Sequence, residues 1–273
     1  MNASRKRAWL WLFLLMSGSF GSLSAAFEWQ APPPEILALA GIRSLPLPDV
    51  SSTTGNPAHL ISSPGLTFSA FHERHFGNLA IPAGGAIVTA ERQNLAWTAS
   101  MTALGDRHYQ EMTTGMALSL PVTKSYQLGL RVNAYLVTLS GAATHWTPSL
   151  SLGALIHIAE RCQMGLYLGN FLHRAPPALR PFPETFALGL VWRFDHADAY
   201  LSWEKEGAHD ANLVLAQSLH PLPWLILQSG IRSNPLQAAG GLSIRFGSVA
   251  LSWALLQHPQ LPVSQSISLE YRF

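Results

Sequence analysis

The fold class is decided by one stretch of sequence, Ser264-Gln265-Ser266-Ile267-Ser268-Leu269-Glu270-Tyr271-Arg272-Phe273. In this stretch large apolar side chains alternate with small or polar ones at every step. Successive side chains of a β-strand point to opposite faces of the sheet. The stretch therefore predicts a strand with an apolar face, made by Ile267, Leu269, Tyr271 and Phe273, and a polar face.

The same period of two recurs along the chain from residue 66 onward. In 241–246, for example, Leu, Ile and Phe alternate with Gly, Ser and Arg. We distinguish about fourteen such segments, most of them about ten residues long, which is the length that a tilted strand needs to cross a bilayer. Twelve strands is the alternative, because the first two segments alternate least clearly.

The second face of these segments is unusual for a water-soluble protein. It consists mainly of Gly, Ala, Ser and Thr, and charged residues make up only 12% of the chain. A soluble β-sandwich would alternate too, but its outer faces would be charged. Small inner side chains and apolar outer ones instead predict an all-β, antiparallel transmembrane β-barrel over residues 65–273. Aromatic residues near the expected strand ends fit girdles at the membrane interfaces: Trp146, Trp192, Trp203, Trp224 and Tyr271.

The first 26 residues have the order of a secretory signal peptide. Positive charges at Arg5, Lys6 and Arg7 precede the apolar run 8–16, and small residues follow. We expect cleavage after Ala26 and export to the bacterial outer membrane. Removing three of the 17 basic residues and none of the acidic ones leaves a net charge near −1. This charge gives no indication of nucleic-acid binding.

Residues 27–64 lack alternation and are rich in proline. The run 36–42 predicts a short turn of helix, but no long helix fits between the prolines. Asn56 is held extended by Pro57, and its side chain can hydrogen-bond to nearby backbone as turn formers do. We expect this segment to be either a periplasmic tail or an element that folds into the barrel lumen as a plug.

Two parts of the chain resemble known outer-membrane families. The run 49–60 resembles the Asn-Pro-Ala-x-Leu signature of PorV/PorQ-type proteins within the FadL-like barrel superfamily, through Asn56, Pro57, Ala58 and Leu60. It departs from the pattern at His59, where glycine is usual. The terminal strand resembles the targeting strands that the barrel-insertion machinery reads, and it ends at Phe273.

The PorV/PorQ resemblance implies an accessory role in protein secretion or surface attachment of the type IX kind. The implied partners are outer-membrane lipid, secretion-complex proteins or exported cargo, and the insertion machinery. The alternative within the same superfamily is FadL-like transport of hydrophobic small molecules.

A third alternative is an outer-membrane lipid hydrolase, which we do not favour. The chain contains neither His-Glu-x-x-His nor Gly-x-Ser-x-Gly. Cys162 is the only cysteine, so thiolate metal clusters are excluded. We therefore expect no enzyme activity, no metal and no cofactor.

Strand parity places a set of polar residues toward the lumen. Buried charges are usually paired, so we expect salt bridges within this set. Glu204 and Glu270 are candidate partners for Arg193 and Arg245, and the sequence does not give the pairing. The set comprises Arg131, Asn133, Arg193, Glu204, Arg245 and Glu270.

Overall fold

The computed structural model describes residues 27, 30, 32–47, 54–59, 65–77, 82–92, 95–140, 144–173, 184–207 and 209–273. The expected signal peptide, residues 1–26, lies outside this part, and so does Leu60 of the Asn-Pro-Ala-x-Leu motif. Among the described residues no helix has both the length and the apolar character needed to cross a bilayer.

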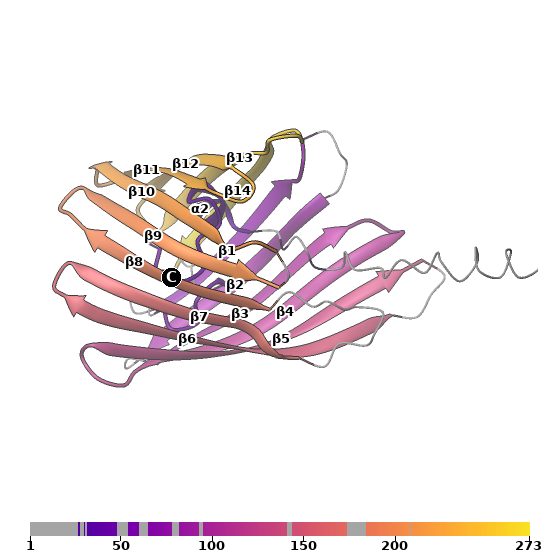
Figure 1. Cartoon of the computed structure of the whole chain (residues 1–273), viewed down its shortest axis with the longest axis horizontal. Coiled ribbons are helices and arrows are strands. Elements are labelled where there is room, and N and C mark those ends of the chain that lie inside the picture. The colour runs from indigo at the N-terminus through magenta and orange to yellow at the C-terminus, as the bar shows by residue number, and fades with distance from the viewer. Residues whose placement is uncertain are drawn as a thin grey trace, which may run out of the picture.

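Fourteen antiparallel strands close into a barrel, each paired with its neighbours in sequence, and β1 pairs with β14 (Figure 1). The predicted strand count of fourteen is confirmed, and the alternative of twelve is wrong. The strands are β1 Gly65–Arg74, β2 Pro82–Arg92, β3 Leu95–Gly105, β4 Tyr109–Pro121, β5 Tyr126–Leu139, β6 His145–Ala159, β7 Cys162–His173, β8 Thr185–Arg193, β9 Ala197–Glu206, β10 Asn212–Leu222, β11 Leu225–Arg232, β12 Gln237–Phe246, β13 Val249–Gln257 and β14 Ser264–Arg272.

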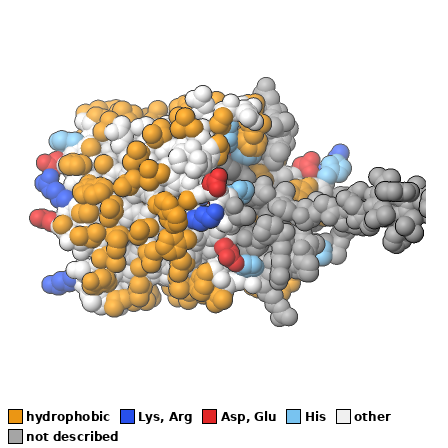
Figure 2. All heavy atoms as spheres, viewed as in Figure 1, with side chains coloured by type: hydrophobic (Ala, Val, Ile, Leu, Met, Phe, Trp, Pro, Cys, Tyr) orange, Lys and Arg blue, Asp and Glu red, His pale blue; other side chains and the backbone are white. Residues whose placement is uncertain are grey.

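The two faces of the wall follow the predicted alternation. In β14, Ser266, Ser268 and Glu270 are buried toward the lumen, whereas Ile267 and Leu269 are exposed on the outside. Figure 2 shows that apolar side chains cover the visible outer wall, while charged side chains gather toward its ends. The aromatic residues expected in the interface girdles all face outward. An apolar exterior and a mostly small or polar inner face are what a barrel in lipid requires.

The lengths of the connections between strands indicate which end of the barrel faces the periplasm. At one end the strands are joined by short turns, such as 160–161, 223–224 and 247–248. At the other end longer connections occur, including 75–81 and 174–184. Outer-membrane barrels place short turns toward the periplasm and longer loops toward the outside, so β14 ends on the periplasmic side.

The described part of the N-terminal segment, defined as residues 27–64, lies inside the barrel. Its helix α2, Pro34–Ala38, packs against the inner faces of β11 to β14 (Figure 1). The short helix agrees with the turn expected in 36–42, and Pro34 stands at its start, where a missing backbone N–H costs nothing. Ser268 of β14 donates a hydrogen bond to Glu35 at 2.9 Å.

The lumen also contains an apolar core that the strand pattern alone did not predict. Leu37, Leu39 and Ile42 of the N-terminal segment pack with inward-facing Val191 and Val214 of the wall. The two valines lie on the inner face of their strands, where most of the other residues are small or polar. The segment thus supplies an apolar surface that buries the few large inner side chains on that side of the lumen.

Candidate functional site

The side chain of Asn56 joins the N-terminal segment to two strands of the wall. Its Nδ2 atom donates to the carbonyl oxygens of Ser44 at 2.7 Å, Ala154 at 3.2 Å and Leu166 at 3.1 Å. Its Oδ1 atom accepts a hydrogen bond from the backbone N–H of Ala58 at 2.9 Å. Asn56 is completely buried, so every one of these bonds is made in place of a bond to water.

A row of glycines lets the segment approach the wall this closely. Gly129 pairs with Gly153, and Gly165 pairs with Gly189, across β5 to β8. A Cβ atom on Gly153 would lie 1.9 Å from Asn56 Oδ1, and one on Gly129 would lie 2.1 Å from the backbone of Pro57. The absence of side chains here creates the groove that holds the Asn-Pro-Ala turn.

Further along, Ser44 continues the contact with the same row. A Cβ atom on Gly165 would lie 2.0 Å from the carbonyl oxygen of Ser44. The hydroxyl groups of Ser44 and Ser202 are hydrogen-bonded at 2.9 Å. The segment therefore follows one band of small residues from β5 to β9.

Two arginines near this contact are ion-paired. Arg43 Nη1 lies 3.2 Å from Glu206 Oε1, and the backbone N–H of Arg43 donates to Glu204 at 3.0 Å. Arg232 of β11 pairs with the other oxygen of Glu204 at 2.8 Å. The negative charge of Glu206 raises the pKa of the Arg43 guanidinium above its ordinary value. Glu204 thus accepts hydrogen bonds from both the segment and the wall.

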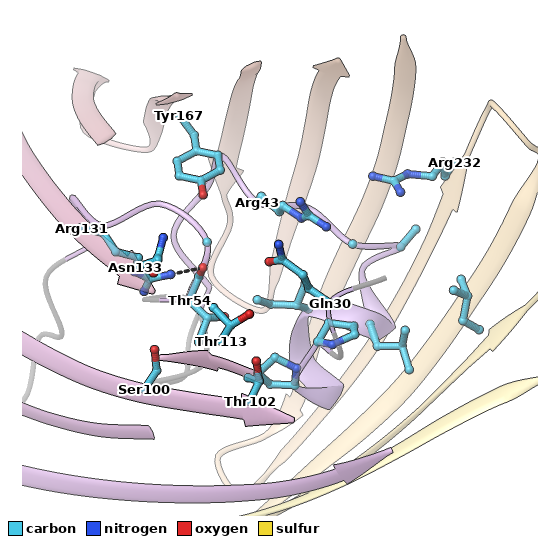
Figure 3. A pocket seen from close by; sticks show the side chains of 18 of the residues that line it. Gln30, Arg43, Thr54, Ser100, Thr102, Thr113, Arg131, Asn133, Tyr167 and Arg232 are labelled. Atoms are coloured by element: carbon cyan, nitrogen blue, oxygen red, sulfur yellow. Dashed lines mark hydrogen bonds between the residues drawn. The ribbon is translucent and has the colours of Figure 1, made fainter. Parts of the chain in front are cut away.

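A cavity of about 960 Å³, its open mouth included, lies between the segment and the wall. One side is apolar and is made by Pro32, Pro33, Ile36 and Leu37 of the segment with Leu256 of β13. The opposite side is polar, and Figure 3 shows its side chains directed into the same space. The polar residues that line it from β3 to β7 are Ser100, Thr102, Thr113, Arg131, Asn133, Tyr135 and Tyr167.

Hydroxyl and amide groups on the polar side come from adjacent strands in register. Ser100 is level with Gly115 on β4, and Gly115 is level with Asn133 on β5. Thr102 is level with Thr113 in the next row. This side can therefore offer several hydrogen-bonding groups to one ligand.

The structure places the residues that the sequence singled out in three different environments. Asn56, Pro57 and Ala58 are buried against the wall, and Arg131 and Asn133 line the cavity. The others lie apart from the cavity: Arg193 is exposed at the end of β8 and donates to Gln163, Glu270 pairs with Arg272, and Arg245 is on β12.

The structure gives an ion-pair partner for each glutamate of the expected lumen set. Glu204 is paired with Arg232, which lies outside that set, and Glu270 is paired with its strand neighbour Arg272. Arg193 has the inward parity, but it stands at the last position of β8, where the lumen meets solvent. Strand parity gives the face on which a side chain lies but not its neighbour across the lumen.

Arg43 and Arg232 were not identified from the sequence, although signals for both exist. Arg43 is the only Lys or Arg in residues 27–64. Arg232 has the same strand parity as the buried Ile226 and Gln228. Arg43 is a lone cation in a segment that enters the lumen, and Arg232 is a cation on the inner face of the wall. Because a buried charge needs a partner of opposite sign, both positions would have predicted nearby carboxylates.

These features define an outer-membrane β-barrel that encloses its own N-terminal segment. The sequence matches no family model and no curated protein. Among solved structures the chain is similar to the toluene transporter TbuX of Ralstonia pickettii, with a TM-score of 0.68, 12% identity, and coverage of 91% of this chain and 100% of that one.

Two further structures show the same fold. The toluene transporter TodX of Pseudomonas putida has a TM-score of 0.70 and 10% identity, and a FadL homologue of Pseudomonas aeruginosa has 0.61 and 11%. Both comparisons cover 91% of this chain and 100% of the other. The fold is therefore that of FadL-type barrels, and the narrower resemblance to PorV/PorQ proteins gains no support from these structures.

Proposed function

We propose that this protein lets small, largely apolar molecules cross the outer membrane through its lumen. The observation that carries the proposal is the cavity between the N-terminal segment and the wall. One of its sides is built from proline and aliphatic side chains, and its other side carries a few hydroxyl and amide groups, a combination typical of small-molecule sites. The similar structures named above as toluene transporters and a FadL homologue favour the same class of substrate.

The N-terminal segment occupies part of the lumen in this conformation, and passage in this proposal involves a shift of the segment. Its contacts with the wall suit such a movement, because many are single hydrogen bonds between small polar groups. The pair formed by Ser44 and Ser202 is one of them. Such a bond contributes about 0.5–1.5 kcal/mol, so one contact can be exchanged without unfolding the barrel.

A disulfide lock tests this proposal more sharply than deletion of the segment, because deletion would also uncover the apolar core in the lumen. The variant Ser44→Cys, Ser202→Cys is made in a Cys162→Ser background, since the hydroxyl oxygens already lie 2.9 Å apart. Proteoliposomes are then assayed for uptake of radiolabelled toluene. We expect uptake to be slow in the oxidised form and to return after reduction.

The matched control is a disulfide within the wall. Ser243 and Ser252 are hydrogen-bonded at 2.8 Å between β12 and β13, and a Cys pair there does not bind the segment. This control should take up toluene equally well in both redox states. Equal uptake by the oxidised and reduced Ser44/Ser202 variant would show that passage does not require the segment to move away from Ser202. An absence of uptake by every folded form would overturn the transport proposal.

The secretion role has no structural observation in its favour. Contacts with secretion-complex proteins or cargo, and recognition of the terminal strand by the insertion machinery, stay predictions from sequence resemblance.

A further inference from the structure

We propose that His75 and His258 belong to an acid-sensitive clasp at the outer end of the barrel, where β1 and β14 close the wall. The clasp is defined as residues 73–77 together with Gln237, His258 and Ser264. It holds the turn after β1 against the connection between β13 and β14 at neutral pH, and it opens in an acidic medium. The inference goes beyond the transport proposal and does not depend on it, because it concerns the wall and not the cavity in the lumen.

The clasp joins two connections at the end of the barrel opposite the periplasmic turns. β1 ends at Arg74, where the connection 75–81 begins, and the connection 258–263 leads from β13 to β14. A Cβ atom added to Gly77 would lie 3.2 Å from Pro262, so the two connections are in contact. Because β1 pairs with β14, this contact lies at the seam between the first and last strands.

A buried carboxylate and a buried imidazole form the first half of the clasp. Glu73 is completely buried, and only 4% of His75 is exposed. His75 Nδ1 lies 3.1 Å from Glu73 Oε1. An ionised carboxylate only accepts hydrogen bonds, so the nitrogen carries the proton between the two groups. A charged imidazole ring strengthens this bond, because hydrogen bonds between ions are stronger than neutral ones.

The hydroxyl group of Ser264 connects this pair to His258. Ser264 is completely buried, and its Oγ atom accepts a hydrogen bond from the backbone N–H of Phe76 at 3.1 Å. The same oxygen lies 3.2 Å from His75 Nδ1 and 3.5 Å from His258 Nε2. The centroids of the two imidazole rings are 6.2 Å apart. One serine at the start of β14 therefore holds the turn after β1 and brings the two histidines together.

The hydrogen bonds of His258 suit its neutral form. Its Nδ1 atom lies 3.0 Å from the side-chain nitrogen of Gln237 on β12. An amide nitrogen only donates, so Nδ1 is the acceptor and carries no proton. Burial lowers the pKa of His258 below its ordinary value, and the positive charge of His75 lowers it as well.

The charges around the clasp leave a second imidazolium group without compensation. Among the described residues, the ionisable groups that face His258 and its partners are His75 and Glu73. The groups that β12 and β14 contribute are an amide and a hydroxyl, and the rest of the connection to β14 contains no ionisable residue. His72 and Arg74 are exposed on the outer face of β1, opposite Glu73. A proton on His258 therefore gives the clasp a net positive charge.

Acid is expected to shift the clasp toward an open form. In an open clasp His258 is exposed to water and has the ordinary histidine pKa of about 6.5. As the pH falls through this value the open form takes up a proton before the closed form does, so the stability that the neutral ring provides is lost. Repulsion between two imidazolium groups 6.2 Å apart shifts the equilibrium at least about threefold toward the open form, even when it is screened as in water.

Amide hydrogen exchange of the full chain in a nonionic detergent tests the clasp. The observable is the protection of the Phe76 amide, which is bonded to Ser264, after correction for the intrinsic effect of pH on exchange. We expect this protection to fall at least about threefold between about pH 7.5 and about pH 5. The internal reference is the amide of Arg272, which donates to Ser248 at 2.9 Å at the periplasmic end of the wall. Its protection should stay constant.

Three variants assign the effect to named groups. In His258→Gln the new amide can still bond to Ser264 but cannot become charged, so the protection of Phe76 should no longer depend on pH. His209→Gln is the matched control, because His209 is an exposed histidine in the connection before β10, and it should keep the pH dependence of the unmodified chain. Ser264→Ala removes the acceptor for the Phe76 amide and should lower its protection already at about pH 7.5.

Four outcomes would overturn the proposal. Constant protection of Phe76 over this pH range in the unmodified chain is the first, and it needs no variant to fold. An equal fall in His258→Gln is the second, because another group would then respond to acid. The third is a parallel fall at Arg272, which would show that the whole barrel loosens. The fourth is unchanged protection of Phe76 in Ser264→Ala, which would show that this hydrogen bond does not hold the turn.

Discussion

At the residue scale, the side chain that does most to place the N-terminal segment is the amide of Asn56. Its Nδ2 group donates to three carbonyl oxygens, and its Oδ1 atom accepts a hydrogen bond from the N–H of Ala58. Only a primary amide combines both in so small a volume. The Asn-Pro-Ala motif is thus explained by the local hydrogen bonding, and the ring of Pro57 disfavours a helical backbone at Asn56.

Asn56→Asp should therefore destabilise the folded barrel although the two side chains have the same shape. It replaces the donor with an oxygen that faces the carbonyl groups of Ser44, Ala154 and Leu166. A buried acceptor without a donor costs about 1–3 kcal/mol, and more when it is charged. Urea unfolding in lipid vesicles measures the loss.

Asn212→Asp is the matched control for this variant. Asn212 uses its Oδ1 atom to accept from the backbone N–H of Asn234 at 2.9 Å, and aspartate keeps that acceptor. We expect its free energy of unfolding to change much less. Equal losses at both sites would show that the hydrogen bonds of Asn56 do not hold the segment.

At the element scale, the band Gly129, Gly153, Gly165 and Gly189 is one structural unit spread over four strands. Its members lie far apart in sequence. From the sequence, each can be recognised only as a small residue on the inner face of its strand. The alternation was sufficient to predict the fourteen strands, because the membrane imposes it on every one of them. It could not show that four of the small positions meet to form a groove, since strand register is decided by pairing across the whole wall.

Gly153→Ala should displace the N-terminal segment without opening the barrel. The added methyl group would overlap Asn56 Oδ1 at 1.9 Å, and overpacking of this kind costs about 1–3 kcal/mol. Limited trypsin digestion detects the displacement, because Arg43 is the only Lys or Arg in residues 27–64. Cleavage after Arg43 should be faster than in the unmodified protein.

Gly240→Ala is the control for that digestion. Gly240 lies on β12, and a Cβ atom there meets only the carbonyl oxygen of Gln228, at an ordinary contact distance of 3.6 Å. Cleavage after Arg43 should be unaffected. If Gly153→Ala is cleaved no faster than this control, the groove is not what positions the segment.

At the scale of the whole molecule, the lumen is a second interior that the N-terminal segment partly fills. The sequence predicted the closed barrel, its outer surface and the presence of Arg131 and Asn133 on the inner face. It could not give the cavity, because the cavity is bounded by two parts of the chain whose relative placement depends on contacts such as Ser44 with Ser202. The pairing of the lumen charges depends on the same placement, since Arg43 of the segment is ion-paired with Glu206 of β9.

The last prediction tests whether the outer surface of the barrel faces lipid. Val132 is exposed on the lipid-facing side near the middle of β5, and Val122 is exposed in the turn after β4. A lysine at the bilayer midplane costs about 2–4 kcal/mol, whereas near an interface it costs about 0–1 kcal/mol. Val132→Lys should therefore lower the free energy of unfolding in lipid vesicles by much more than Val122→Lys. In a water-exposed wall the two lysines would cost the same small amount, so equal and small losses would contradict the membrane placement of the barrel.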